Sequence, residues 1–246
     1  MISKVGIKAL FFLCLLQFPA RAQFIQSGRI VFERKTNLKK RFGNEPRMKN
    51  FITEENKYRN EQFELFFNDS CTVFRPLPDE EQAQQQGFMK FLTTRNTVYQ
   101  NLRTKQKFVA MDLWGNSAYI KDSMDQRQWK ITESKRNISG YMCRKAVWEM
   151  NDSTRIYAWF SPDIVPSIGP EGFQGLPGAI LGMATEDGGV VYFAKSIETV
   201  PLPAGVLNYD EKGKEVYNEE QLKKMLLERM GQWVKPRDLE AMFSWL

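Results

Sequence analysis

The feature that most constrains the fold is a succession of short segments, from about residue 27 to residue 198, in which apolar and polar side chains alternate. A period of two residues is typical of strands with one buried face. Tight polar turns separate most segments, and Asp187-Gly188-Gly189 is a strong hairpin signal. We therefore expect a mainly β (α+β) protein with an open antiparallel sheet. The expected strands are residues 29–35, 63–67, 72–75, 107–113, 117–121, 128–132, 145–150, 155–160, 179–184 and 190–196.

Two stretches favour helices. Residues 79–92 are rich in Gln and Glu, which is typical of a short helix or of a mobile loop. A stronger helix begins near Asn218, whose side chain can cap the first turn while Gln221 supplies the return bond. We expect its apolar face, and that of a last helix after Pro236, to pack on the core, with docking onto a partner or a membrane surface as the alternative. These faces carry Leu222, Met225, Leu226, Met230 and Trp233, then Leu239, Met242, Phe243 and Leu246.

The N-terminus predicts export. Lys4 and Lys8 precede a short apolar run, and the small-residue pattern Ala20-Arg21-Ala22 follows it. We expect a secretory signal over residues 1–22 that is cleaved before Gln23. The mature part, 23–246, is then one domain, with a sheet over about 27–200 and helices over 216–246. No later stretch approaches the ~20 apolar residues of a membrane-spanning helix, so we expect a soluble protein of the periplasm, with the cell surface or secretion as alternatives.

Loss of the signal changes the charge. The whole chain has 35 basic and 29 acidic residues, a net charge of +6. Removal of Lys4, Lys8 and Arg21 leaves 32 basic residues and a net charge of +3. This excess is too small and too dispersed to predict a nucleic-acid partner.

Cleavage also removes Cys14 and leaves Cys71 and Cys143. In an oxidising compartment the pair could form one disulfide. The alternative is two buried, reduced thiols in separate strands.

The chain contains no histidine. This excludes Ser-His-Asp and Cys-His nucleophile systems and histidine zinc sites, and two cysteines alone make no metal site, so we expect no metal and no cofactor. An enzyme could still use paired carboxylates. The candidates near the most distinctive loop are Glu149, Asp152, Asp163 and Glu171, and we expect them to be solvated surface acids.

That loop, residues 161–178, is rich in proline and glycine. In Leu176-Pro177-Gly178 the proline presets the first central angle of a type II turn and the glycine supplies the positive φ of the second. We expect Phe173 and Leu176 to anchor the loop from beneath. Its distinctive residues are Pro166, Gly169, Pro170, Phe173, Gly175, Leu176, Pro177 and Gly178.

This part of the sequence resembles the GLPGLI family of exported proteins, found mainly in Bacteroidota. The family's name describes the turn that is written here Gly175-Leu176-Pro177-Gly178-Ala179-Ile180, with alanine in place of the second leucine. The resemblance implies a strongly curved, open antiparallel sheet with one or two helices on one face, similar to the LolA-like half-barrel of lipoprotein carriers. It implies little about function. Further matching residues are Gly140-Tyr141, Cys143, Lys145-Ala146, Ala158-Trp159-Phe160, Ile164, Pro166 and Gly169-Pro170.

Trp148, Tyr157, Trp159 and Phe160 lie in adjacent expected strands. Alternation puts Tyr157 and Trp159 on one face and Phe160 on the other. One interpretation is two buried faces of a covered sheet. The sharper hypothesis is that one face lines an apolar groove, with the proline-glycine loop as its lid.

These observations favour a non-enzymatic, monomeric binding or carrier protein of the periplasm. Its expected ligand is an apolar small molecule, a lipid or a peptide, held under the proline-glycine loop. The first alternative is an accessory subunit that docks onto an outer-membrane or envelope protein complex. The second is an envelope hydrolase that uses carboxylates.

Overall fold

The computed structural model describes residues 24–42, 48, 51–78, 92–113, 115–151, 154–231 and 236–243. The strands are β1 (Gly28–Asn37), β2 (Tyr58–Phe67), β3 (Cys71–Pro76), β4 (Thr97–Asn101), β5 (Gln106–Leu113), β6 (Asn116–Ser123), β7 (Lys130–Ile138), β8 (Tyr141–Asn151), β9 (Thr154–Ser161), β10 (Ala179–Thr185), β11 (Val190–Glu198) and β12 (Val216–Tyr217). The helices are α2 (Leu38–Phe42), the short 3-10 helix η3 (Pro170–Gly172), α4 (Glu219–Met230) and α5 (Pro236–Phe243).

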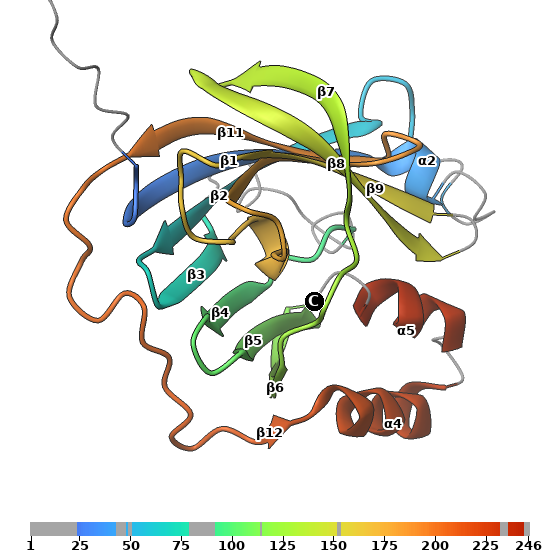
Figure 1. The fold of residues 1–246 in the computed structure, drawn as a ribbon. Helices are drawn as coiled ribbons and strands as arrows, with labels where there is room; N and C mark the ends of the chain where they lie inside the picture. The colour runs from blue at the N-terminus through green and yellow to red at the C-terminus, as the bar shows by residue number, and fades with distance from the viewer. Residues whose placement is uncertain are drawn as a thin grey trace, which may run out of the picture.

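Within these residues all twelve strands form one open sheet in the order β12-β6-β5-β4-β3-β2-β1-β11-β10-β9-β8-β7. Neighbours are antiparallel except β12 and β6, which are parallel. The expected mainly β fold with an open antiparallel sheet is therefore confirmed. Figure 1 shows that the sheet is strongly curved and that the chain segment carrying η3 lies inside the curve.

The hydrophobic core lies on the inner face of this curve, which we define as the face covered by the loop between β9 and β10. Ile30 and Phe32 of β1 and Phe63 of β2 are fully buried there. The rings of Phe63 and Phe74 stack with centroids 5.0 Å apart. Alternation along each strand sends the intervening side chains to the opposite, outer face.

Each expected strand overlaps an observed one, and two observed strands were not expected. β12 is only two residues long and pairs through a parallel bridge to β6. β4 turns Val98 and Gln100 inward, so its buried side is half polar and the alternation of apolar residues is broken. β7 is longer than expected because its exposed, charged residues give no apolar pattern to follow.

The two C-terminal helices begin and pack as the sequence predicts. The backbone N–H of Gln221 donates to Asn218 Oδ1 at 2.8 Å, and the backbone N–H of Asn218 donates to Gln221 Oε1 at 2.9 Å, so the capping box is confirmed. The helices bury Leu222, Leu226, Leu239 and Phe243 in the main core. Trp233 and Leu246 lie outside the described residues.

Two other expectations fall outside the part that the structure describes, namely the signal over residues 1–22 and nearly all of the helix-or-loop segment 79–92. Leu92, at the end of that segment, is described, and it packs with Leu38 and Ile52 in a small second core. Among the described helices, none has the length and apolar character needed to cross a membrane.

Candidate functional site

The proline-glycine loop joins β9 to β10 and crosses the inner face of the sheet as far as β4. There Gln100 Nε2 donates a hydrogen bond of 2.7 Å to the carbonyl oxygen of Gly172. Trp129 Nε1 donates to the carbonyl oxygen of Gln174 at 2.9 Å. Phe173 is fully buried and Leu176 is 2% exposed. The prediction that these two side chains anchor the loop from beneath is confirmed.

Beneath the loop the space is occupied by aromatic side chains of the protein itself. The Phe173 ring lies 6.0 Å from that of Trp148 and 6.4 Å from that of Trp129. The guanidinium of Arg127 lies 4.2 Å from the Phe173 ring centroid. Phe173 and these neighbours therefore pack beneath the loop, where we expected a ligand under a lid.

The turn that ends the loop differs from the expected type II turn. The backbone N–H of Gly178 donates to the carbonyl oxygen of Leu176 at 2.8 Å, which closes a three-residue turn around Pro177. The N–H of Ala179 pairs with Ile164 across the loop at 3.0 Å, so it does not close a four-residue turn. The expected positive φ of Gly178 is confirmed at 134°.

Glu171, at the tip of the loop, enters a buried cluster of charged side chains. Its Oε1 accepts a hydrogen bond of 2.5 Å from the Tyr192 hydroxyl and one of 3.3 Å from Arg34 Nη1. Arg34 also binds Glu61 Oε2 at 2.6 Å and the carbonyl oxygen of Thr94 at 2.7 Å. One guanidinium of β1 is thus shared by a carboxylate of β2 and a carboxylate of the loop.

Three properties distinguish Glu171. Its φ of 52° lies in the left-handed region, which non-glycine residues seldom adopt. Its Oε2 is buried and has no hydrogen-bond partner among the described residues. Burial raises the pKa of the carboxyl to about 7, although Arg34 and the hydrogen bond from Tyr192 act in the opposite direction. The expectation that Glu171 is a solvated surface acid is wrong, because the loop carries it into the core.

The sequence reasoning did not single out Arg34, Glu61 or Tyr192. Arg34 and Glu61 face each other across the β1–β2 register. A signal was present, because both occupy positions whose strand neighbours two residues away, Phe32 and Phe63, are apolar and point inward. Charged residues at inward positions of a strand indicate a buried, paired cluster.

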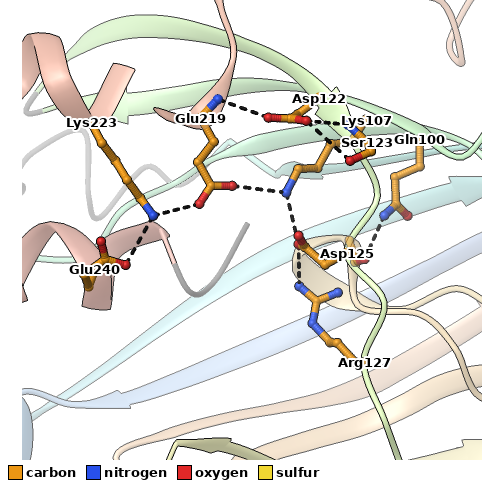
Figure 2. A network of polar contacts seen from close by, with 10 residues as sticks. Gln100, Lys107, Asp122, Ser123, Asp125, Arg127, Glu219, Lys223 and Glu240 are labelled. Carbon is orange, nitrogen blue, oxygen red and sulfur yellow. Dashed lines mark hydrogen bonds and ion pairs between the residues drawn. The ribbon is translucent and has the colours of Figure 1, made fainter. Parts of the chain in front are cut away.

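A second polar network joins the loop to the C-terminal helices (Figure 2). Lys107 Nζ lies 3.0 Å from Asp125 Oδ2 and 3.7 Å from Glu219 Oε2 at the start of α4. The N–H of Glu219 donates to Asp122 Oδ2 at 3.1 Å. Gln174 Nε2 of the loop donates to the carbonyl oxygen of Asp125 at 2.5 Å. Sheet, loop and α4 are therefore held as one unit.

On the outer face, the hairpin of β7 and β8 folds over its neighbouring strands. Its two-residue turn, Ser139-Gly140, has positive φ at both positions, which is typical of tight hairpins. Ser139 Oγ donates to the carbonyl oxygen of Ala194 in β11 at 2.6 Å. A Cβ placed on Gly182 would lie 2.8 Å from Ile138 Cδ1, so the absence of a side chain at Gly182 lets the hairpin approach β10.

Between the hairpin and the sheet lies a groove of about 600 Å³, which we call the outer groove. Its floor follows β10, where Gly182 pairs with Trp159 of β9 on one side and Phe193 of β11 on the other. In the next row Ala184 lies between Tyr157 and Val191. Two small residues therefore run along the floor, and larger apolar residues form the walls. The lining includes Arg136, Ile138, Trp159, Ala184, Val191 and Phe193.

Cationic side chains surround the Trp159 wall of the outer groove. The guanidinium of Arg136 lies 5.2 Å from the ring centroid of Trp159, and Lys145 Nζ lies 5.8 Å from it. Lys145 Nζ is also 3.8 Å from the ring centroid of Tyr157. These distances are typical of cation–π contacts.

The structure divides the predicted aromatic set between the two faces. Tyr157 and Trp159 are half-buried on the outer face, as their alternation predicted. Phe160 is buried on the inner face, and Trp148 packs on the loop there. Of this outer pair, Trp159 lines the outer groove, which also needs the β7–β8 hairpin to fold over β10 and β11.

The remaining candidate acids do not join Glu171. Asp163 Oδ2 lies 3.4 Å from Ser161 Oγ. Glu149 is exposed and pairs with Lys130 at 3.2 Å, and Asp152 lies outside the described residues. In the part of the chain that the structure describes, no three cysteine or acidic side chains come together as metal ligands would.

Both cysteines that the structure describes, Cys71 and Cys143, are free thiols. Cys71 begins β3 and Cys143 lies in β8, and five strands separate β3 from β8 in the sheet. Burial raises the pKa of Cys143 to about 11 and raises that of Cys71 as well. This arrangement agrees with the alternative of two separate thiols.

Comparison with protein families matches one segment of the chain. Residues 148–182 match the family model described as "Protein of unknown function (Porph_ging)", which corresponds to the GLPGLI resemblance. The segment contains β9, the proline-glycine loop, most of β10 and the residues Trp159 and Gly182 of the outer groove. No curated protein matches the chain.

Two solved structures of PNGF-II have a similar fold. The structure in space group C2 has 18% sequence identity and a TM-score of 0.53, and the match covers 82% of this chain and 32% of that one. The structure in space group P21 has 16% identity and a TM-score of 0.53, with coverages of 81% and 33%. This chain therefore spans about a third of the length of the solved structures it matches, and at these identities the likeness concerns the fold alone.

Proposed function

We propose that this chain is an exported, non-catalytic binding protein of the GLPGLI type that holds an apolar ligand in the outer groove. The observation that carries the proposal is the row Trp159, Gly182 and Phe193, in which two aromatic walls flank a residue without a side chain. The volume of about 600 Å³ falls within the range of about 300–1,000 Å³ that is typical of small-molecule sites.

The width of the outer groove follows from the sheet. Walls on β9 and β11 stand two strand spacings apart, which is roughly 10 Å between backbones. Trp159 and Phe193 are half-buried and leave apolar surface in contact with water. Covering that surface with a ligand is favourable by about 25 cal/mol for each Å². The ligand site is therefore proposed on the face opposite the proline-glycine loop.

The chemistry of the chain favours binding over catalysis. It has no histidine for an acid, base or nucleophile system. The buried carboxylates Glu61 and Glu171 are both occupied by Arg34 and lie on the inner face, away from the outer groove. The groove itself is lined mainly by apolar side chains and backbone.

The test is binding of a neutral apolar dye, Nile red, to the full exported chain. We expect saturable fluorescence enhancement that weakens at least tenfold in Trp159→Ala, which removes one wall, and in Ala184→Phe, which fills the floor. Tyr209→Ala is the matched control, because Tyr209 is an exposed aromatic residue stacked on Phe108, outside the groove lining. Equal affinities in all three variants would assign the dye to another surface and reject the proposal.

A further inference from the structure

We propose that the ligand of the outer groove is a single-chain carboxylic acid whose acid group is held by Arg136 and Lys145. This inference rests on the proposed function and names the ligand class of the same groove. The observation behind it is that Arg136 and Lys145 lie beside Trp159, which forms one wall of the apolar groove.

The Trp159 wall of the outer groove has two positively charged side chains beside it, Arg136 and Lys145. Two other basic residues of this face have carboxylate partners, since Arg155 binds Glu186 at 3.1 Å and Lys195 lies 3.7 Å from Glu33, whereas Lys35 lies 4.0 Å from the Tyr58 ring centroid. Within the described residues, Arg136 and Lys145 contact aromatic rings and form no ion pair. Two positive charges beside one wall favour an anionic group there.

The nearest acid of the groove is already engaged. Glu186 follows the floor residue Ala184 by two positions along β10. Its Oε1 accepts hydrogen bonds from the Tyr157 hydroxyl at 2.8 Å and from Arg155 Nη1 at 3.1 Å. These bonds lower the pKa of Glu186 and keep it ionised, but they also direct its charge toward Arg155. Lys145 also lowers the pKa of Glu186, so Arg136 is the cation of the Trp159 wall that acts on no carboxylate within the described residues.

The floor of the outer groove is straight, because it follows the single strand β10. Gly182 and Ala184 are successive outward-facing residues of one strand, and their Cα atoms are about 7 Å apart. The floor is therefore a straight track along this strand. The hairpin residue Ile138 covers Gly182 and closes that end of the track, so a linear chain would lie over Ala184 and against the Trp159 wall. One acyl chain suits this width, and its carboxylate then reaches the guanidinium of Arg136 over the edge of Trp159.

Carboxylate recognition by these two side chains differs in kind. Arg136 can bind both oxygens with parallel N–H donors, whereas Lys145 supplies a single point charge. Both lie at a half-exposed surface, so salt should screen their contribution with a Debye length of about 10 Å at 0.1 M. Affinity for an acid should fall with salt, and affinity for a neutral chain of equal length should not.

The experiment measures, by isothermal titration calorimetry on the full exported chain, the affinities of dodecanoic acid, dodecan-1-ol and dodecyltrimethylammonium. We expect the acid to bind at least tenfold more tightly than the alcohol and the cation to bind most weakly. In Arg136→Gln with Lys145→Gln the advantage of the acid over the alcohol should disappear. Arg103→Gln is the control for loss of a surface charge outside the outer groove, since Arg103 is exposed and pairs with Asp69 at 2.9 Å.

The outcomes separate the two proposals. Equal binding of acid and alcohol, or tighter binding of the cation, would overturn the carboxylate inference and leave the apolar groove as the ligand site. Failure of all three compounds, together with failure of the dye, would overturn the proposed function itself. A loss of acid binding as large in Arg103→Gln as in the double variant would show a general charge effect and also reject the inference.

Discussion

Gly178 ends the proline-glycine loop at a place where no side chain fits. Its φ is 134°, and an added Cβ would lie 2.1 Å from the carbonyl oxygen of Ser161. That atom belongs to the backbone of β9 and cannot move aside without disturbing the β9–β10 pairing. We expect Gly178→Ala to lower the free energy of unfolding by at least about 3 kcal/mol, measured by urea denaturation.

A matched glycine separates the steric effect from the backbone effect. Gly213 also has a positive φ, 73°, but nothing lies within 4 Å of an added Cβ. Gly213→Ala should therefore cost only about 1 kcal/mol. Similar losses in the two variants would contradict the close approach of Gly178 to β9.

Glu171 makes stability depend on pH near neutrality. Its pKa is about 7 in the folded protein, and an unfolded glutamate has a pKa near 4.3. The folded state therefore binds this proton more tightly, so its contribution to stability is greatest below about pH 4 and is lost as the pH rises through 7. We expect the free energy of unfolding to fall by roughly 1–3 kcal/mol between pH 5.5 and pH 8.

Tyr192 and Arg34, which contact Glu171, do not change protonation state between pH 5.5 and pH 8. Burial raises the pKa of Tyr192 well above its usual value, and Glu61, Tyr192 and Glu171 keep Arg34 protonated. Glu171→Gln should abolish most of the dependence on pH. Glu186→Gln is the control, because the hydrogen bond from Tyr157 and the contact with Arg155 lower the pKa of Glu186 and place its titration below this range. An unchanged slope in Glu171→Gln would refute the assignment.

Single residues of the loop were only partly predictable. Phe173 and Leu176 are large apolar residues in a loop of turn-forming residues, and large apolar residues are usually buried. Glu171 could not be placed in the same way, because its burial depends on Arg34 and Tyr192, which belong to strands far away in sequence. Pattern along the chain carries no information about a partner that another strand supplies.

At the scale of elements, the cap of α4 is a local device with a measurable effect. Asn218 accepts a hydrogen bond from the N–H of Gln221, and the adjacent N–H of Glu219 is satisfied separately by Asp122. Asn218→Ala should therefore lower the free energy of unfolding by about 1 kcal/mol in urea denaturation. Asn218→Ser preserves an acceptor at this position and should cost a few tenths of a kcal/mol. Equal losses would mean that the cap does not contribute to the cooperative fold.

The elements that sequence predicts well are those with local signals. The capping box and the Asp187-Gly188-Gly189 hairpin are set by residues within four positions of each other. The expected type II turn failed because Ala179 pairs with Ile164 across the loop. The outer groove could not be predicted from the sequence for the same reason. It forms only when the β7–β8 hairpin contacts β10 and β11 through Ile138 and Ser139.

At the scale of the whole molecule, the sequence predicts a processed, exported chain. We expect intact-mass spectrometry of the protein recovered from the envelope of its host to give the mass of a polypeptide that begins at Gln23. We expect gel filtration of the same protein to give the size of a monomer. Replacement of Ala20 and Ala22 by Asp should leave the precursor uncleaved, because processing requires small residues at these positions. A mature N-terminus at Met1 in the wild-type protein would contradict the prediction of export by cleavage.

The strand order has a consequence for how the chain reaches its fold. β1 is the first of the described strands along the chain, yet one of its two neighbours is β11, and Arg29 meets Glu198 across 169 positions of sequence. Until β11 arrives, that edge of β1 carries unpaired backbone groups next to the inward residues Ile30 and Phe32. Pairing over such distances is slow because the entropy of closing the chain must be lost first. While the chain folds, the incomplete sheet therefore exposes an edge to which a second unfolded copy can add, and we expect the pairing of β1 with β11 to be the step at which folding competes with aggregation.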